Sequence, residues 1–287
     1  MSIDKKITPQ SYHTSYLPTW CPGCGDFGIM AAIKNALSEL QIPSHNVVIV
    51  YGIGCAGNMA STIKCYGFHS LHGRALPVAL GAKIANKNLT VIAVAGDGDQ
   101  YSEGTNHLIH LARYNSNITL IVANNRLFSL TTGQASPTTP EGTATKTTPW
   151  GEIKHEFNPL ALSLVSGTTF VARGAAFNLS HLTNLIKQGI KHPGFSHIDV
   201  LQQCVTLNKI NTVEWYQQRV YELGANYDKN NYQLALDKAL ETEKLPIGIF
   251  YQTKRPVYEE KIDWTAGTNA ITEKIVFNKE KLLKEFE

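Results

Sequence analysis

The sequence predicts an α/β protein built as a single domain, in which helices cover both faces of a parallel sheet. Two short apolar runs rich in β-branched residues, 89–99 and 118–125, end abruptly in glycine or polar residues, as buried parallel strands do. The segment 103–115 between them has the length and pattern of one crossover helix. With 287 residues, 43% hydrophobic and 17% charged, the chain is long enough for one large core.

The other elements follow in chain order from the same patterns. A helix over 27–40 precedes the first central strand at 46–51, and a helix over 77–86 has proline in its first turn, where a missing N–H is tolerated. The Thr-, Pro- and Gly-rich stretch 131–157 exceeds the roughly 12 residues that structureless loops usually span, so it is a functional or disordered loop. Periodicity then predicts a helix over 158–166, a strand over 168–172, a helix over 178–191, a strand over 197–201 and a helix over 232–243.

Composition and the positions of turn residues predict the domain boundaries, and they argue against nucleic-acid and membrane binding. We expect an entry segment 1–25 with a Cys-x-x-Cys motif, an α/β domain over 26–250 and a charged C-terminal arm over 251–287. The net charge of +3 and the lack of a basic run interleaved with aromatics argue against nucleic-acid binding. No run approaches the roughly 18 apolar residues of a membrane span, and no apolar signal core follows Met1, so we expect a cytoplasmic protein that does not bind membranes.

Polar side chains follow two neighbouring strands at their carboxyl ends. Asp97 ends the first run and Asn125 ends the second, and open α/β sheets bind ligands at this edge. A carboxylate and a carboxamide suit a hard cation that keeps positions open for a diphosphate. Gly96 and Gly98 allow backbone amides to approach phosphate oxygens. The alternative is that Gly-Asp-Gly is only a turn and Asn-Asn only a loop.

Four of the five cysteines share a setting. Cys21 and Cys24 lie in one Cys-Pro-Gly-Cys motif, whereas Cys55 and Cys204 each follow a predicted strand on the same edge as Asp97. No strand leads into the Cys-x-x-Cys motif, which argues against a thioredoxin-like redox pair. Four thiolates can hold a [4Fe–4S] cluster or a zinc ion, although zinc more often binds two short Cys-x-x-Cys motifs. Cys65 is better explained as a small buried residue.

The sequence resembles the β subunits of the 2-oxoacid:ferredoxin oxidoreductases over nearly its whole length. Gly-Asp-Gly followed at this distance by Asn-Asn is similar to the thiamine diphosphate motif of thiamine-dependent enzymes. The stretches that carry the closer resemblance, in the family's order, are Trp-Cys-Pro-Gly-Cys-Gly-Asp-Phe-Gly (20–28), Tyr-Gly-Phe-His-Ser-Leu-His-Gly-Arg-Ala-Leu-Pro (66–77), Gly-Asp-Gly-Asp (96–99), Thr-Gly-Gln-Ala-Ser-Pro-Thr (132–138), Phe-Val-Ala-Arg-Gly (170–174), Ile-Asp-Val-Leu-Gln-Gln-Cys (198–204), Asn-Thr-Val-Glu-Trp-Tyr (211–216) and Pro-Ile-Gly-Ile-Phe-Tyr-Gln (246–252).

The resemblance implies a thiamine diphosphate-binding fold, an enzyme activity and a set of cofactor ligands. The activity is the coenzyme A-dependent oxidative decarboxylation of a 2-oxoacid, such as pyruvate or 2-oxoglutarate, with electrons passed through a [4Fe–4S] cluster to ferredoxin. Asp97, Asn125 and the carbonyl of Leu127 would bind Mg²⁺, and Cys21, Cys24, Cys55 and Cys204 would bind the cluster. The residues expected to contact thiamine diphosphate are Ile53, Gly54, Cys55, Ala56, His72, Gly98, Asp99, Ser129 and Leu130.

The resemblance also implies a partner. The glutamate that activates the thiamine ring is not identifiable in this chain, and in this superfamily it belongs to the pyrimidine-binding domain. We therefore expect no catalytic residue on this chain, inactivity of the chain alone, and an α subunit, or α plus γ subunits, that covers the cofactor edge. The 131–157 loop and the tail after Lys254 are the segments expected to contact it.

The expected substrate is not specified by the resemblance. Two positions that are often basic in relatives are neutral here, Asn58 and Thr132, so a dicarboxylate such as 2-oxoglutarate would need Lys64, Lys146 or the other subunit. Two rival classes remain: a thiamine-dependent decarboxylase or synthase half with structural zinc, and a non-enzymatic zinc-stabilised binding module. His107 and His110, one helical turn apart, are expected to be an ordinary helix face and not a metal pair.

Overall fold

The computed structural model describes residues 6–262, 271, 283 and 284. Within them, one sheet has the strand order β2-β1-β3-β4-β8-β7-β10-β9. Strand β10 pairs antiparallel with β7, whereas β1, β2, β3, β4, β7 and β8 pair in parallel. The predicted α/β class is therefore confirmed, with an antiparallel step near one edge. The strands of this sheet are β1 (Val47–Tyr51), β2 (Tyr66–His69), β3 (Thr90–Gly96), β4 (Thr119–Asn124), β7 (Phe170–Ala175), β8 (Ser196–Leu201), β9 (Val220–Glu222) and β10 (Leu245–Gln252).

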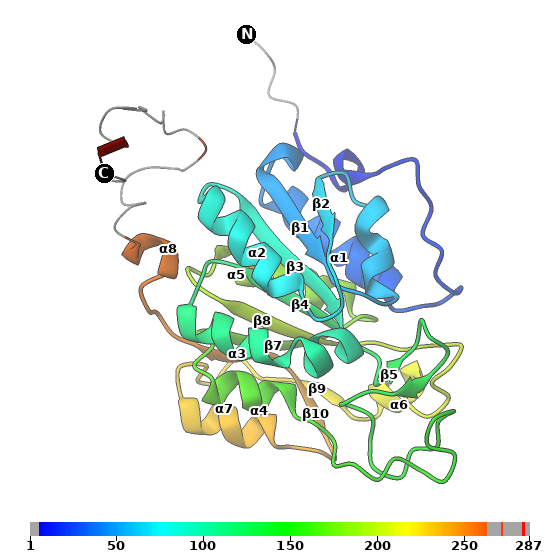
Figure 1. Ribbon diagram of the computed structural model, residues 1–287. Coiled ribbons are helices and arrows are strands. Elements are labelled where there is room, and N and C mark those ends of the chain that lie inside the picture. The colour runs from blue at the N-terminus through cyan, green and yellow to red at the C-terminus, as the bar shows by residue number, and fades with distance from the viewer. Residues whose placement is uncertain (1–5, 263–270, 272–282, 285–287) are drawn as a thin grey trace.

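Helices cover both faces of the sheet (Figure 1). Successive side chains of a strand point to opposite faces, so Ile49 packs in the core with α1 and α5 while Val50 packs in the core with α2 and α3. Helices α4 and α7 continue the second layer beyond α3. The helices of these two layers are α1 (Asp26–Glu39) and α5 (Leu179–Lys191) on one face, and α2 (Ala75–Ala85), α3 (Thr105–Tyr114), α4 (Pro159–Val165) and α7 (Tyr232–Ala239) on the other.

Most of the predicted elements are present within one to three residues of their expected ends. The predicted helix at 232–243 is shorter, because α7 ends at Ala239. The sequence patterns did not predict β2, β9 or β10. Short additional elements are α6 (Val213–Gln217), α8 (Tyr258–Lys261), a two-stranded pair of β5 (Leu127–Phe128) with β6 (Gln134–Ala135), 3₁₀ turns at Pro9–Tyr12, Ser44–Asn46 and Ala56–Ser61, and a π-helical turn at Asp99–Glu103 that leads into α3.

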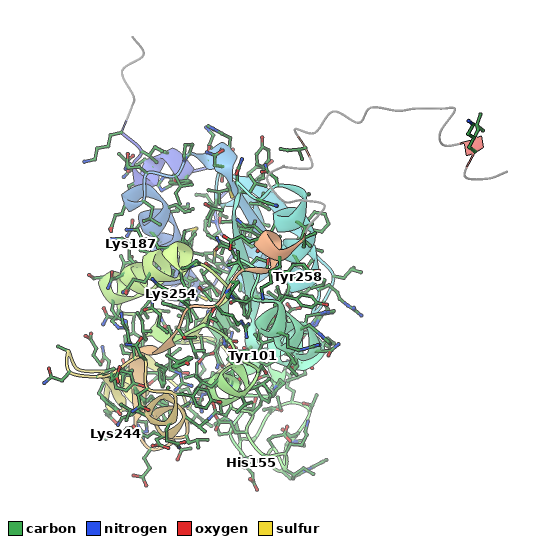
Figure 2. All side chains as sticks on the ribbon, turned by 90° about the vertical axis from the view of Figure 1, so that its left-hand side faces the viewer. Tyr101, His155, Lys187, Lys244, Lys254 and Tyr258 are labelled. Atoms are coloured by element: carbon green, nitrogen blue, oxygen red, sulfur yellow. The ribbon has the colours of Figure 1, made fainter. Side chains whose placement is uncertain are left out.

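The 131–157 loop has two parts. Its first part is inside the molecule: Ser136, Thr138 and Thr139 are buried. Its second part is a hairpin-like excursion, in which the Gly142 N–H donates to the Glu152 carbonyl at 2.7 Å, and it extends to the exposed His155 at one end of the molecule (Figure 2). The buried part supports the functional alternative for this loop.

The chain after β10 packs back on its own domain. The Thr253 N–H donates to the Thr169 carbonyl at 2.9 Å, and the Asn115 side chain donates to the Arg255 carbonyl at 2.9 Å. Both contacts lie at the edge where β4 and β7 begin, opposite their carboxyl ends, so residues 253–262 do not lie over the predicted site. The expected arm from 263 onward lies outside the described residues apart from 271, 283 and 284. The boundaries at 25/26 and 250/251 stay predictions.

No helix among the described residues combines the length and the apolar composition that a membrane crossing requires.

Candidate active site

A pocket opens at the carboxyl ends of β1, β3 and β4. It encloses about 470 Å³ including space open to solvent. Every residue that the sequence predicted to contact thiamine diphosphate or Mg²⁺ lines it, and so do Phe128, Thr131 and Gln202. The predicted residues brought together are Ile53, Gly54, Cys55, Ala56, His72, Asp97, Gly98, Asp99, Asn125, Leu127, Ser129 and Leu130.

Asp97 is a buried carboxylate directly after β3, with an exposed fraction of 1%. Ser136 and Thr138 donate to its Oδ2 at 2.5 and 2.8 Å, and the Asn125 N–H lies 3.4 Å from Oδ1. Burial raises the pKa of Asp97 to about 6, although these hydrogen bonds oppose the shift. No basic side chain forms an ion pair with it among the described residues, so its charge is left for a cation to balance.

The turn after β4 is shaped by a strained residue. Arg126 has a left-handed φ of 63°, which is uncommon for a residue with a side chain. Its side chain pairs with Glu156 at 3.3 Å, and its carbonyl accepts from the Thr139 hydroxyl at 2.6 Å. The Asn125 Oδ1 accepts from the Leu127 N–H at 3.1 Å, which closes the turn. The turn thereby places Asn125 and Leu127, the two other predicted Mg²⁺ ligands, in the wall of the same pocket.

The Gly-Asp-Gly-Asp segment forms the floor of the pocket. A Cβ on Gly98 would lie 2.6 Å from the Phe128 ring, so only glycine allows this approach. Asp99 accepts from the Gly73 N–H at 2.8 Å, and burial raises its pKa despite this bond. The His72 Nδ1 lies 3.2 Å from Asp99 and 2.7 Å from Glu103, so two carboxylates face this ring nitrogen in the pocket wall.

The four predicted cluster ligands gather beside this pocket. Burial raises the pKa of Cys55, the Ser129 hydroxyl lowers it by donating to the sulfur at 3.5 Å, and the nearby charges of Asp26, Cys204 and Cys21 raise it again. Among the described residues no three His, Cys, Asp or Glu side chains are close enough to hold one metal ion. The ligand set Cys21, Cys24, Cys55 and Cys204 therefore stays a prediction.

Two residues that the sequence patterns did not single out connect these parts. Gln202 accepts from Asn125 Nδ2 at 3.2 Å and donates to the Cys24 sulfur at 3.5 Å, so it bridges the predicted cation site and the predicted cluster. A Cβ on Gly25 would lie 2.4 Å from this side chain. Trp20 donates to the Cys55 carbonyl at 2.7 Å and fastens the Cys-x-x-Cys segment to the end of β1. The only available signal for Gln202 was its place two residues before Cys204.

The remaining predicted positions lie apart from the pocket lining. Cys65 is half-buried, and burial raises its pKa to about 12, as expected for a packing residue. Lys64 is exposed. Thr132 and Lys146 line a neighbouring hollow that shares Leu127 with the pocket. His107 contacts Arg74 and His110 contacts Arg113, consistent with a helix face.

Two family models together match most of the chain. The model described as "Thiamine pyrophosphate enzyme, C-terminal TPP binding domain" matches residues 51–200, and a model of the C-terminal part of the pyruvate ferredoxin oxidoreductase beta subunit matches residues 204–266. The chain is 45% identical over 258 residues to the 2-oxoacid:ferredoxin oxidoreductase subunit beta of Saccharolobus solfataricus, with 85% of each chain covered. The chain belongs to the β subunits of the 2-oxoacid:ferredoxin oxidoreductases. It is thus a subunit of an oxidoreductase, and the matched domain supports thiamine diphosphate as a cofactor.

Two further relatives bear on this β subunit. It is 34% identical to the 2-oxoglutarate synthase subunit KorB of Archaeoglobus fulgidus over 87% of this chain and 91% of that one. A solved structure of the 2-oxoglutarate:ferredoxin oxidoreductase from Magnetococcus marinus, with 2-oxoglutarate, coenzyme A and succinyl-CoA bound, superposes with a TM-score of 0.92 at 34% identity, covering 99% of this chain and 97% of that chain. The two family models meet near Cys204, yet β8 and β10 belong to one sheet, so both matched segments share one core.

Proposed function

We propose that this β subunit, together with an α subunit, converts a 2-oxoacid, coenzyme A and two oxidised ferredoxins into an acyl-CoA, CO₂, a proton and two reduced ferredoxins. The observation that carries the proposal is that Cys55, Asp97 and Asn125 line one pocket. A predicted cluster ligand and the predicted cation ligands therefore share the wall of the site where carbon chemistry would occur. This arrangement suits an enzyme that removes electrons from a bound intermediate one at a time.

The pocket fits Mg²⁺ and a diphosphate. Asp97 is buried and lacks an ionic partner among the described residues, and Asn125 and Leu127 flank it with oxygen atoms of the kind that Mg²⁺ prefers. Gly98 keeps the floor free of side-chain atoms, and the His72 ring lines the pocket beside it. Thiamine diphosphate, when bound, supplies the electron sink for decarboxylation.

The thiols fit a [4Fe–4S] cluster better than one zinc ion. Each cysteine of a cluster binds a different iron, so the sulfur atoms lie farther apart than around one tetrahedral zinc. Only Cys21 and Cys24 share a short Cys-x-x-Cys motif, whereas a zinc ion is more often bound by two such motifs. Gln202 and Ser129 each donate to one of the sulfurs, and such hydrogen bonds stabilise thiolates and tune a cluster.

The substrate would enter beside the Leu127 turn. The hollow there contains Lys146, the one of the two proposed lysines that lies next to the pocket. A lysine ammonium at this place suits the distal carboxylate of a dicarboxylic 2-oxoacid. The relatives from Archaeoglobus fulgidus and Magnetococcus marinus are named after 2-oxoglutarate, which is a dicarboxylate, and these names agree with a dicarboxylic substrate.

The partner would cover the mouth of the pocket. Leu130 lines the pocket yet is 49% exposed, and Leu71, next to His72, is 78% exposed. Trp150 and Ile153 on the 131–157 loop are also exposed, so the pocket lining and this loop both present apolar side chains at the surface. An α subunit that carries the ring-activating glutamate would bury them, and an obligate interface of this kind is expected to be large and apolar.

Reconstitution of the two subunits tests this function. The β subunit alone, purified without oxygen, is expected to give no 2-oxoacid-dependent and coenzyme A-dependent reduction of ferredoxin or of a viologen dye. Addition of the α subunit is expected to restore the reduction. Turnover by the isolated β subunit would contradict the assignment of this chain to one half of the active site.

A further inference from the structure

Three of the sequence stretches that resemble the family meet at one buried side-chain cluster. Asn124 is the last residue of β4, whereas Arg173 and Asp199 lie within β7 and β8, and the three are 4%, 7% and 0% exposed. None of them lines the pocket, and none has a role in the proposed chemistry. The cluster also contains Tyr101, which is 3% exposed and is labelled in Figure 2.

The centre of the cluster is an ion pair fixed by the sheet. Arg173 and Asp199 are register partners on the adjacent parallel strands β7 and β8, and Arg173 Nε donates to Asp199 Oδ2 at 3.1 Å. The other carboxylate oxygen, Oδ1, accepts from Asn124 Nδ2 at 3.0 Å and from the Tyr101 hydroxyl at 2.9 Å. The Asp199 carboxylate therefore accepts hydrogen bonds from three side chains that belong to three different elements.

The proton positions in this cluster follow from Asp199, because a carboxylate only accepts. The Tyr101 hydroxyl donates its one proton to Asp199. His197 Nε2 lies 2.9 Å from the same hydroxyl and must therefore donate to the Tyr101 oxygen. Burial lowers the pKa of His197 to about 4, so the ring is neutral and its Nδ1 accepts from Ser163 at 2.6 Å. Donor and acceptor are thus defined for each hydrogen bond in the series Ser163, His197, Tyr101 and Asp199.

Hydrogen bonds of Thr138 connect this cluster to Asp97. Because Asn124 turns its Nδ2 toward Asp199, it presents Oδ1 to the Thr138 hydroxyl at 2.9 Å. That hydroxyl also lies 2.8 Å from Asp97 Oδ2, so its single proton is shared between the Asn124 and Asp97 oxygens. Asp97 is therefore two hydrogen-bonded side chains away from a buried ion pair. A buried ion pair is a weak source of net stability, so orientation is the better explanation of its presence.

We propose that Asn124, Thr138, Arg173 and Asp199 are positioning residues that orient the Asp97 carboxylate for Mg²⁺. The inference rests on the proposed function, since it takes Asp97 as a cation ligand. It assigns a role to the first asparagine of the Asn-Asn pair and to the Arg and Asp of two family stretches. Groups that orient a metal ligand commonly change metal affinity by about 10- to 100-fold when removed.

The test measures Mg²⁺ binding without turnover. The α–β enzyme, freed of cation and cofactor by chelation, is saturated with thiamine diphosphate and titrated with Mg²⁺ in a calorimeter. Asn124→Leu and Thr138→Val are each expected to weaken Mg²⁺ binding by about tenfold. The double variant is expected to lose no more Mg²⁺ affinity than either single variant, because both changes interrupt the same hydrogen-bonded connection from Asn124 through Thr138 to Asp97.

Two matched variants separate positioning from general damage. Thr138→Ser keeps the hydroxyl and is expected to bind Mg²⁺ as the wild type does. Thr169→Val removes another buried hydroxyl, 1% exposed, at the opposite edge of the sheet, and is expected to leave Mg²⁺ affinity unchanged. The electron paramagnetic resonance spectrum of Mn²⁺, bound in place of Mg²⁺, is expected to change in Thr138→Val and not in Thr138→Ser or Thr169→Val.

The outcomes distinguish this inference from the proposed function. Unchanged Mg²⁺ affinity and an unchanged Mn²⁺ spectrum in Asn124→Leu and Thr138→Val would overturn the inference if Asp97→Ala still loses the cation. Unchanged affinity in Asp97→Ala would overturn the proposed cation site itself. If Asn124→Leu fails to fold, the comparison of Thr138→Val with Thr138→Ser still tests the positioning role. Equal Mg²⁺ affinities of these two variants would refute it.

Discussion

Replacing Asp97 with asparagine in the cofactor-free β subunit is expected to stabilise the fold and to remove cation binding at once. Burial raises the pKa of this carboxyl from 3.8 to about 6. A group whose pKa is raised on folding binds more protons in the native state, so stability falls as the pH rises from about 4 to about 6. The shift of about two pKa units corresponds to about 3 kcal/mol above pH 6. An asparagine side chain has nearly the same shape without the charge and avoids this cost, but its NH₂ group cannot accept the hydrogen bond from the Asn125 N–H, which offsets about 1 kcal/mol.

The assay is urea unfolding of the cation-free β subunit at two pH values. Near pH 7.5 the variant should be more stable by about 2 kcal/mol, and near pH 5 by less than about 1 kcal/mol, because the wild-type carboxyl is then largely protonated in the native state. With Mg²⁺ and thiamine diphosphate, the wild type should gain stability and Asp97→Asn should not.

Asp26 supplies the matched control. It is also fully buried with a pKa raised to about 6 by burial, and it contacts the predicted cluster ligand Cys24 but does not line the pocket that would hold the cation. Asp26→Asn should therefore raise stability in the same pH range and keep the stabilisation by Mg²⁺ and thiamine diphosphate. A variant Asp97→Asn that is less stable than wild type near pH 7.5, or that still responds to the cation, would refute the reasoning.

Three further predictions concern the pocket and the thiols. Asn125→Ala should weaken Mg²⁺-dependent thiamine diphosphate binding less than Asp97→Ala, because a neutral carbonyl contributes less charge than a carboxylate; equal losses by calorimetry would contradict this order. Gly98→Ala should lower thiamine diphosphate affinity by about tenfold, since a Cβ 2.6 Å from the Phe128 ring costs about 1–3 kcal/mol of overpacking, and the added change Phe128→Leu should recover part of the loss. Serine at Cys21, Cys24, Cys55 or Cys204 should lower the iron content, whereas Cys65→Ser should keep it; loss of iron in Cys65→Ser with retention in Cys204→Ser would show that the ligand set is wrong.

Several elements could be predicted because one local pattern determined them. Strands β3 and β4 are apolar runs rich in β-branched residues, and their ends place Asp97 and Asn125 at one edge of the sheet. Strand β10 was missed because Pro246 and Gly248 interrupt its pattern, and Gly248 has a left-handed φ of 136°. Strand β2 was missed because it is short and exposed along its whole length, so it lacks the alternation of a half-buried strand.

The supporting residues of the site were not predictable from spacing. Thr138 reaches Asp97 from a loop 41 residues further along the chain, and Gln202 reaches Cys24 across 178 residues. Nothing in the local sequence of either residue encodes that contact, because the tertiary fold creates it. Arg173 and Asp199 meet only through the register of β7 and β8. Residues at strand ends can therefore be placed from sequence, whereas the side chains that orient them cannot.

Iron and acid-labile sulfide analysis of the anaerobically purified β subunit decides whether this chain transfers electrons through a cluster. We expect about four irons and four sulfides per chain, the content of one [4Fe–4S] cluster, with visible absorbance that bleaches when a 2-oxoacid is added to the α–β enzyme. About one zinc per chain without sulfide would contradict electron transfer through this subunit and would favour a thiamine-dependent decarboxylase half.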